Sequence, residues 1–94
     1  MDKRYKPLPA DEMLKLREEL ALVIDANPDW SVAQVLRHVR KTLHLTHADM
    51  AKVGKISMAT LKNIEGGRSS PTLKTVESLL APFGLCLRVG HRPR

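Results

Sequence analysis

The chain has 94 residues, of which 43% are hydrophobic and 28% charged, so it has room for one small core but not for a multilayered enzyme cleft. Its net charge of +6 is uneven, because residues 1–30 hold five basic and seven acidic side chains whereas residues 31–94 hold eleven basic and three acidic ones. Such a basic excess favours a polyanionic partner such as nucleic acid. The sequence lacks an apolar run that could span a membrane or form a signal peptide, and its single cysteine excludes an internal disulfide. We therefore expect a cytoplasmic protein that does not associate with membranes.

The first third of the chain predicts a basic arm and one amphipathic helix. Residues 1–9 combine lysine, arginine and proline, which is typical of a flexible terminus. Residues 10–26 have acidic residues in the first turn and then an apolar stripe with helical spacing, made of Met13, Leu16, Leu20, Val23 and Ile24. This helix has three possible roles, which are to complete the core, to extend a dimer seam, or to offer a surface to a protein partner.

A second helix is predicted from Ser31 to about Leu43. Ser31 and Gln34 have the spacing of a capping box, and Trp30 precedes them at a position that packs against the helix start. The apolar stripe consists of Val32, Val35, Leu36, Val39 and Leu43. The basic residues Arg37, Arg40 and Lys41 are assigned to the polar side, where they either touch phosphates or are simply solvated.

Residues 46–67 predict two short helices joined by a tight turn. Thr46 caps the first helix with Asp49 as its reciprocal partner, and Gly54 ends it. Its apolar face is predicted to contain Met50, Ala51 and Val53. Ser57 caps the second helix, which buries Leu61 and Ile64 and stops at Gly66 and Gly67. In a helix-turn-helix the second helix enters the DNA major groove, so this unit predicts DNA binding.

The chain is predicted to end with one more helix and a strand. A helix that opens at Pro71 or Thr72 and closes at Pro82 has Leu73, Val76, Leu79 and Leu80 on its apolar face, with Phe83 also in the core. Residues 84–89 then alternate with a period of two. A lone strand is unstable, so we expect it to pair antiparallel with the same strand of a second copy through Leu85, Leu87 and Val89. Residues 90–94 form a basic tail.

The segment Leu45 to Leu87 resembles the lambda-repressor-like, Xre-type helix-turn-helix family. The matching features are Leu45-Thr46, Ala51, the six-residue step from Ala51 to Ser57, Thr60-Leu61, Ile64-Glu65, Gly67, Pro71 with Leu73, and Gly84. The resemblance implies an all-α fold of five helices plus one C-terminal β-strand. This expected fold is a single domain over residues 10–89, with a DNA-binding core at 31–83 and a dimerisation strand at 84–89. The strand after Gly84 is similar to that of HipB-type antitoxins, whose dimers pair such strands.

Two positions depart from the family pattern. Gly54 comes one place early and Lys55 occupies the usual glycine place, so either the first helix of the pair ends sooner or Lys55 adopts a left-handed conformation. His47 replaces a common glutamine, and its imidazole still has a hydrogen-bond donor for a phosphate.

The resemblance also implies which residues contact DNA. Ser57, Met58 and Ala59 begin the reading helix, and Lys62 and Asn63 lie further along its exposed side. Lysine suits guanine, asparagine suits adenine, and Met58 and Ala59 suit thymine methyl groups. Thr46, His47, Lys55 and Arg68 are the expected phosphate contacts, which set register without reading sequence.

The function expected from the sequence is a dimeric, sequence-specific repressor of a near-palindromic double-stranded DNA operator. The likeness to HipB-type antitoxins implies that it also neutralises a toxin protein, such as a HipA-like kinase, and represses its own promoter. The alternatives are a phage or restriction-system regulator without a toxin partner, and an adaptor with a degenerate motif. The sequence predicts no catalytic residues, no cofactor and no metal site, since His44 and His47 lack further ligands and Cys86 lacks an activating histidine.

Overall fold

The computed structural model of the chain describes residues 9–90 and contains five α-helices and one 3-10 turn in that range. The elements are α1 (Ala10–Asp25), α2 (Val32–Thr42), α3 (His47–Gly54), α4 (Met58–Glu65), α5 (Leu73–Leu80) and η1 (Ala81–Phe83). The predicted arm and tail lie outside the described residues, except for Pro9 and Gly90. All five predicted helices are therefore confirmed, with ends within about two residues of those expected.

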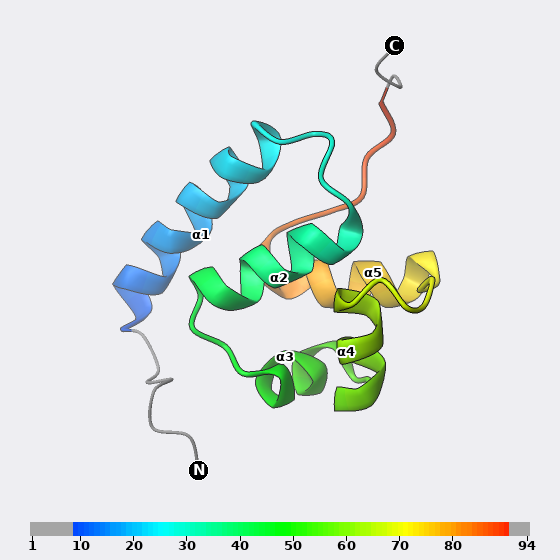
Figure 1. The fold of residues 1–94 in the computed structure, drawn as a ribbon. Coiled ribbons are helices and arrows are strands. Elements are labelled where there is room, and N and C mark those ends of the chain that lie inside the picture. Colours follow the sequence, from blue (N-terminus) through cyan, green and yellow to red (C-terminus); the bar gives the residue numbers. More distant parts are fainter. Residues whose placement is uncertain (1–8, 91–94) are drawn as a thin grey trace.

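Helix α2 runs through the middle of the molecule, with α1 on one side of it and α3 and α4 on the other (Figure 1). Its start is fixed by the predicted capping box, in which Gln34 N–H donates to Ser31 Oγ over 3.2 Å and Ser31 N–H donates to Gln34 Oε1 over 2.8 Å. Helices α1, α4 and α5 therefore pack on α2, while α3 packs on α4 and α5.

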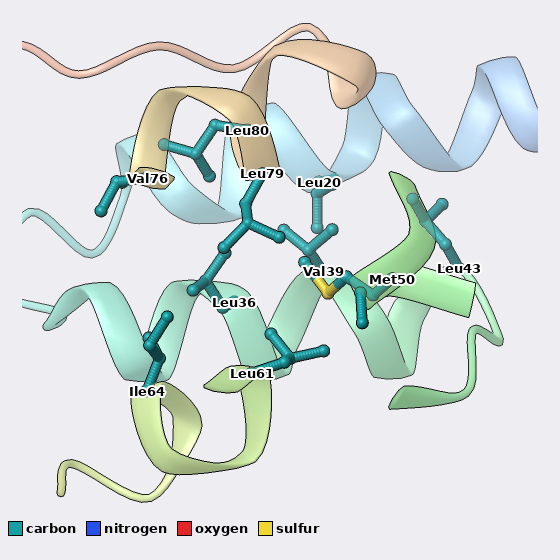
Figure 2. Close-up of a cluster of buried hydrophobic side chains, with 11 residues drawn as sticks. Leu20, Leu36, Val39, Leu43, Met50, Leu61, Ile64, Val76, Leu79 and Leu80 are labelled. Atoms are coloured by element: carbon teal, nitrogen blue, oxygen red, sulfur yellow. The ribbon is translucent and has the colours of Figure 1, made fainter. Parts of the chain in front are cut away.

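The core is a single cluster of aliphatic side chains contributed by all five helices. Figure 2 shows Leu36 and Val39 of α2 between Leu61 of α4 and Leu79 of α5. Each of these side chains is fully buried, which contributes roughly 1.5–3 kcal/mol per residue. The predicted core is confirmed at Leu20, Leu36, Val39, Leu43, Met50, Ala51, Leu61, Ile64, Val76, Leu79 and Leu80. Phe83 is half-buried against it.

Three residues assigned to apolar faces are instead exposed, namely Val23, Val53 and Leu73. Leu73 is the first residue of α5, so its side chain precedes the turn that packs on α2 and α3. Val23 and Val53 lie at the borders of the buried faces of α1 and α3, where the helix surface is open to solvent. The predicted helical spacing is therefore confirmed, but the predicted apolar faces are wider than the faces that are actually buried.

The predicted C-terminal strand is not present among residues 9–90. After Gly84, which has a φ of 74°, Leu85 N–H donates to Leu80 O and closes the end of α5 and η1. The backbone N–H groups of residues 86–90 have no backbone acceptor in the described part of the chain. A strand exists only when a neighbouring strand supplies those hydrogen bonds, and the part of the chain that the structure describes contains no such strand.

Candidate nucleic-acid interface

Helix α4 has one buried side and one exposed side. Leu61, Ile64 and Glu65 face the core and are buried. All five residues predicted to read base edges are exposed, and four of them, Met58, Ala59, Lys62 and Asn63, lie within the helix itself. The exposed side therefore presents a thioether, a methyl group, an ammonium group and an amide on consecutive turns.

Ser57, the fifth of these residues, has its hydroxyl committed to the helix end. Thr60 N–H donates to Ser57 Oγ over 3.0 Å, and the two hydroxyl oxygens lie 2.8 Å apart. This is the predicted N-cap, which is worth about 1 kcal/mol of helix stability. Ser57 thus fixes where α4 begins, and Thr60 takes part in the same hydrogen-bonded turn.

The turn before α4 resolves the irregular glycine position. Helix α3 includes Gly54, and Lys55 follows it in the left-handed region with φ 58° and ψ 41°. A Cβ on Gly54 would overlap the Leu79 side chain, so glycine is needed there for close packing of α3 on α5. Ile56 N–H then donates to Ala51 O over 3.0 Å, which completes the turn. Of the two alternatives, the left-handed Lys55 is the one observed, and its side chain is exposed.

Thr46 and His47 begin α3. Asp49 N–H donates to Thr46 Oγ1 and Thr46 N–H donates to Asp49 Oδ2, both over 3.0 Å, which confirms the predicted capping box. The His47 side chain is 31% exposed, and its Nε2 lies 3.4 Å from Glu65 Oε1. One edge of the imidazole therefore faces a carboxylate of α4 while part of the ring remains open to solvent.

Arg40 does not lie on the polar side of α2 as predicted. It is buried, and its Nε lies 3.2 and 3.1 Å from the two carboxylate oxygens of Glu65, while Nη2 donates to Oε1 over 3.1 Å. The side chains of Arg40 and Glu65 are only 9% and 4% exposed. Burial of either charge alone would be strongly unfavourable, so each depends on the other. The pair, which the sequence reading missed, connects α2 to the back of α4.

Arg68 folds back onto the end of α4. Its Nε donates to Asn63 Oδ1 over 3.1 Å, and its Nη2 donates to the Lys62 carbonyl oxygen over 3.2 Å. The guanidinium lies over Gly66, where an added Cβ would come within 2.5 Å of Nη1. One predicted phosphate contact and one predicted base contact are therefore joined in the described chain.

The charges of the molecule separate by element. The stretch 46–68 carries four exposed basic side chains, Lys52, Lys55, Lys62 and Arg68, against one exposed acid, Asp49. Helix α1 carries five acids against two bases. Because α1 lies across α2 from α4, its negative field is kept away from the basic side (Figure 1).

Other kinds of site find little support in the described residues. Between Pro9 and Gly90, no three histidine, cysteine or acidic side chains gather where they could bind a metal ion. Within the same range, every helix is too short or too polar to cross a bilayer.

Comparison with known proteins agrees with this geometry. A family model described as a helix-turn-helix domain matches residues 31–88. The HTH-type transcriptional regulator DdrOP3 of Deinococcus deserti is 36% identical over 50 residues, which are 53% of this chain and 39% of that regulator. The aligned part thus spans well under half the length of that relative. No solved structure matches the chain.

Proposed function

This chain belongs to the helix-turn-helix domain family, and we propose that it is a sequence-specific, DNA-binding transcriptional regulator of the lambda-repressor-like, Xre type. The observation that carries the proposal is the two-sided character of α4. Its inner side is fixed by Leu61, Ile64 and the Arg40–Glu65 pair, while its outer side is exposed and carries varied hydrogen-bonding and apolar groups. A rigid helix with a free face is what major-groove reading requires.

In this proposal, Met58, Ala59, Lys62 and Asn63 meet base edges, while Ser57 sets the start of the reading helix. Thr46, His47, Lys55 and Arg68 contact phosphates, which fix the register. Their placement supports this assignment, because Lys55 and Arg68 are exposed at the two ends of α4 and His47 is partly exposed at the start of α3. Acidic α1 lies on the side of α2 opposite α4, where it does not oppose the DNA phosphates.

The active form in this proposal is a homodimer that represses a near-palindromic operator, with reading helices about 34 Å apart in successive major grooves. The dimer forms by antiparallel pairing of residues 84–89. Support comes from the backbone N–H groups of residues 86–90, which have no backbone acceptor within residues 9–90, and from the exposure of Leu87 and Val89. A hollow of about 360 Å³ beside this segment, lined in part by Ile24 and Trp30, would receive apolar side chains of the partner.

The dimer is tested with Leu87→Pro, which removes a ladder hydrogen bond and bends the segment. The variant should sediment as a monomer, whereas Lys74→Ala, on the exposed side of α5, should sediment as wild type does. A Leu87→Pro variant that stays dimeric would place the interface elsewhere.

A second role, neutralisation of a toxin protein such as a HipA-like kinase, is favoured by the outer face of α1. This helix precedes the matched residues 31–88, and it exposes Leu14 by 59% and Leu22 by 71% among acidic side chains. If the protein encoded beside this gene binds there, Leu22→Glu should weaken that complex and leave DNA binding unchanged. Equal binding of wild type and variant would remove α1 from the interface.

The central proposal is tested by fluorescence anisotropy with DNA from upstream of the protein's own gene, scrambled DNA as the control, and varied salt. We expect preferential binding to the upstream DNA, with the logarithm of affinity falling against that of salt with a slope of about −4, because each of two protomers contributes two cationic phosphate contacts, Lys55 and Arg68. Equal affinity for scrambled DNA would contradict sequence-specific regulation.

A further inference from the structure

We infer that Arg68 is a specificity-determining residue, which holds the Asn63 amide so that it donates to guanine or thymine rather than pairing with adenine. The inference rests on the proposed function, in which Asn63 faces base edges. Its starting point is the hydrogen bond from Arg68 Nε to Asn63 Oδ1, over 3.1 Å, on the exposed side of α4.

The chemistry of the two groups fixes the orientation of the amide. A guanidinium has donors and no acceptor, so the atom of Asn63 that faces it is the carbonyl oxygen. The second hydrogen bond, from Arg68 Nη2 to the Lys62 carbonyl oxygen, holds the guanidinium over the end of α4. The amide therefore has its oxygen directed at Arg68, and its Nδ2 is a donor that has no acceptor among residues 9–90.

A free asparagine pairs with adenine by accepting from N6 and donating to N7. In this structure the accepting atom, Asn63 Oδ1, already accepts a hydrogen bond from the positively charged Arg68 guanidinium. Oδ1 retains a second lone pair, but an adenine amino group brought to it would set its partial positive charge beside the guanidinium. Guanine O6 and N7 and thymine O4 are acceptors only, so the same charge attracts them.

Gly66 makes this arrangement possible. Its φ of −84° is open to any residue, so the backbone does not require glycine. An added Cβ would instead lie 2.5 Å from Arg68 Nη1 and 2.9 Å from Cζ, which would push the guanidinium off its position. Gly66→Ala is therefore a substitution that displaces Arg68 from Asn63 while the charge of the protein stays the same.

The experiment selects binding sites from a random pool of DNA duplexes, once with the wild-type protein and once with Asn63→Ala. The position in the site at which Asn63→Ala loses the base preference of wild type is the position that Asn63 contacts. At that base we expect wild type to prefer guanine or thymine over adenine about tenfold. Gly66→Ala and Arg68→Lys both keep the charge and lose the Nε contact, so this preference should fall to about twofold or reverse toward adenine. Ser69→Ala, next to Arg68 in sequence, should behave as wild type.

The possible failures are distinct. If wild type enriches no sequence at all, the proposed function fails and the inference falls with it. If wild type enriches a site but prefers adenine at the Asn63 position, or if Gly66→Ala and Arg68→Lys leave its preference unchanged, the regulator stands and the role of Arg68 is overturned. A uniform loss of affinity in Arg68→Ala, with the base preference kept, would likewise reduce Arg68 to a phosphate contact.

Discussion

The two sides of α4 differ in what constrains them. The inner side is enclosed by core leucines and by a buried ion pair, so its residues have one position and one set of partners. The outer side has Met58 and Lys62 exposed, and substitution there disturbs no core packing. The comparison teaches that the placement of this helix and the chemistry that it presents are controlled by different residues. Substitutions on the two sides should therefore separate folding from DNA binding.

The largest expected effect comes from Glu65→Ala. This change leaves the Arg40 guanidinium buried without its carboxylate partner, which should lower the free energy of unfolding by about 3–5 kcal/mol. Urea denaturation followed by circular dichroism measures it. Glu77→Ala, on the exposed face of α5, is the control and should change stability by less than about 0.5 kcal/mol. A loss below about 1 kcal/mol in Glu65→Ala would mean that Arg40 reaches water easily, and that the inner side is less fixed than the structure indicates.

Gly54→Ala tests the packing that supports α3, the helix before the reading helix. The new methyl group would overlap Leu79, and overpacking of this kind costs about 1–3 kcal/mol. The melting temperature should fall accordingly, while Ala48→Gly, at an exposed site of the same helix, should lose about 1 kcal/mol through helix propensity alone. An unchanged melting temperature in Gly54→Ala would show that α3 and α5 separate without penalty.

Lys55→Gly should act in the opposite direction. A lysine with φ 58° carries a conformational cost that glycine avoids, so the variant should be more stable by about 1 kcal/mol. It also removes one proposed phosphate contact from each protomer of the dimer, so the salt slope of DNA binding should fall by about two units. If stability rose while the slope stayed the same, Lys55 would have a conformational role only.

Lys62→Ala is the smallest expected change in stability, at most about 0.5 kcal/mol, because the side chain is exposed. On the proposed operator it should nevertheless cost about 1–3 kcal/mol of binding, concentrated at one base. Anisotropy titrations on operators altered at single positions measure this. Equal loss on every sequence would reassign Lys62 to the phosphate backbone.

The local rules of helix formation allowed most of the fold to be predicted. The Ser31–Gln34 and Thr46–Asp49 capping boxes and the Ser57 cap depend only on residues three apart, and all three are present. The apolar period likewise identified the core residues of α2 and α4. Interactions of this kind involve residues that are close together in the sequence, so a single sequence is enough to predict them.

The prediction that all charged residues of α2 lie on its polar side is wrong for Arg40, which is buried. The signal was nevertheless present, since Arg40 lies four residues after Leu36 and three before Leu43, on the apolar stripe itself. Glu65 similarly follows Leu61 by four residues. Two opposite charges, each inside an apolar stripe, predict a buried pair, although the sequence does not say that they meet.

The remaining differences depend on contacts that a pattern does not encode. The alternation of residues 84–89 predicted a strand, and none is present among residues 9–90, because alternation along the chain does not supply the neighbouring strand that pairing requires. The contact between Arg68 and Asn63 depends on the path of the chain after Gly67, whose φ of 73° turns it back. Such a contact becomes visible only in three dimensions.

Helix α1 has a further consequence for the motions of the molecule. Of its sixteen residues only Leu20 is fully buried, and its last residue is held to the rest by an exposed contact between Asp25 and Arg88. Elements with so few buried contacts open separately from the rest of a domain, at a small fraction of the global unfolding free energy. Backbone amides of α1 should therefore exchange with deuterium much faster than those of α2. A ligand that covered the exposed Leu14 and Leu22 of α1 would slow that exchange. The exchange rate of α1 would then show that the ligand is bound, while the exchange rates of α3 and α4 stayed the same.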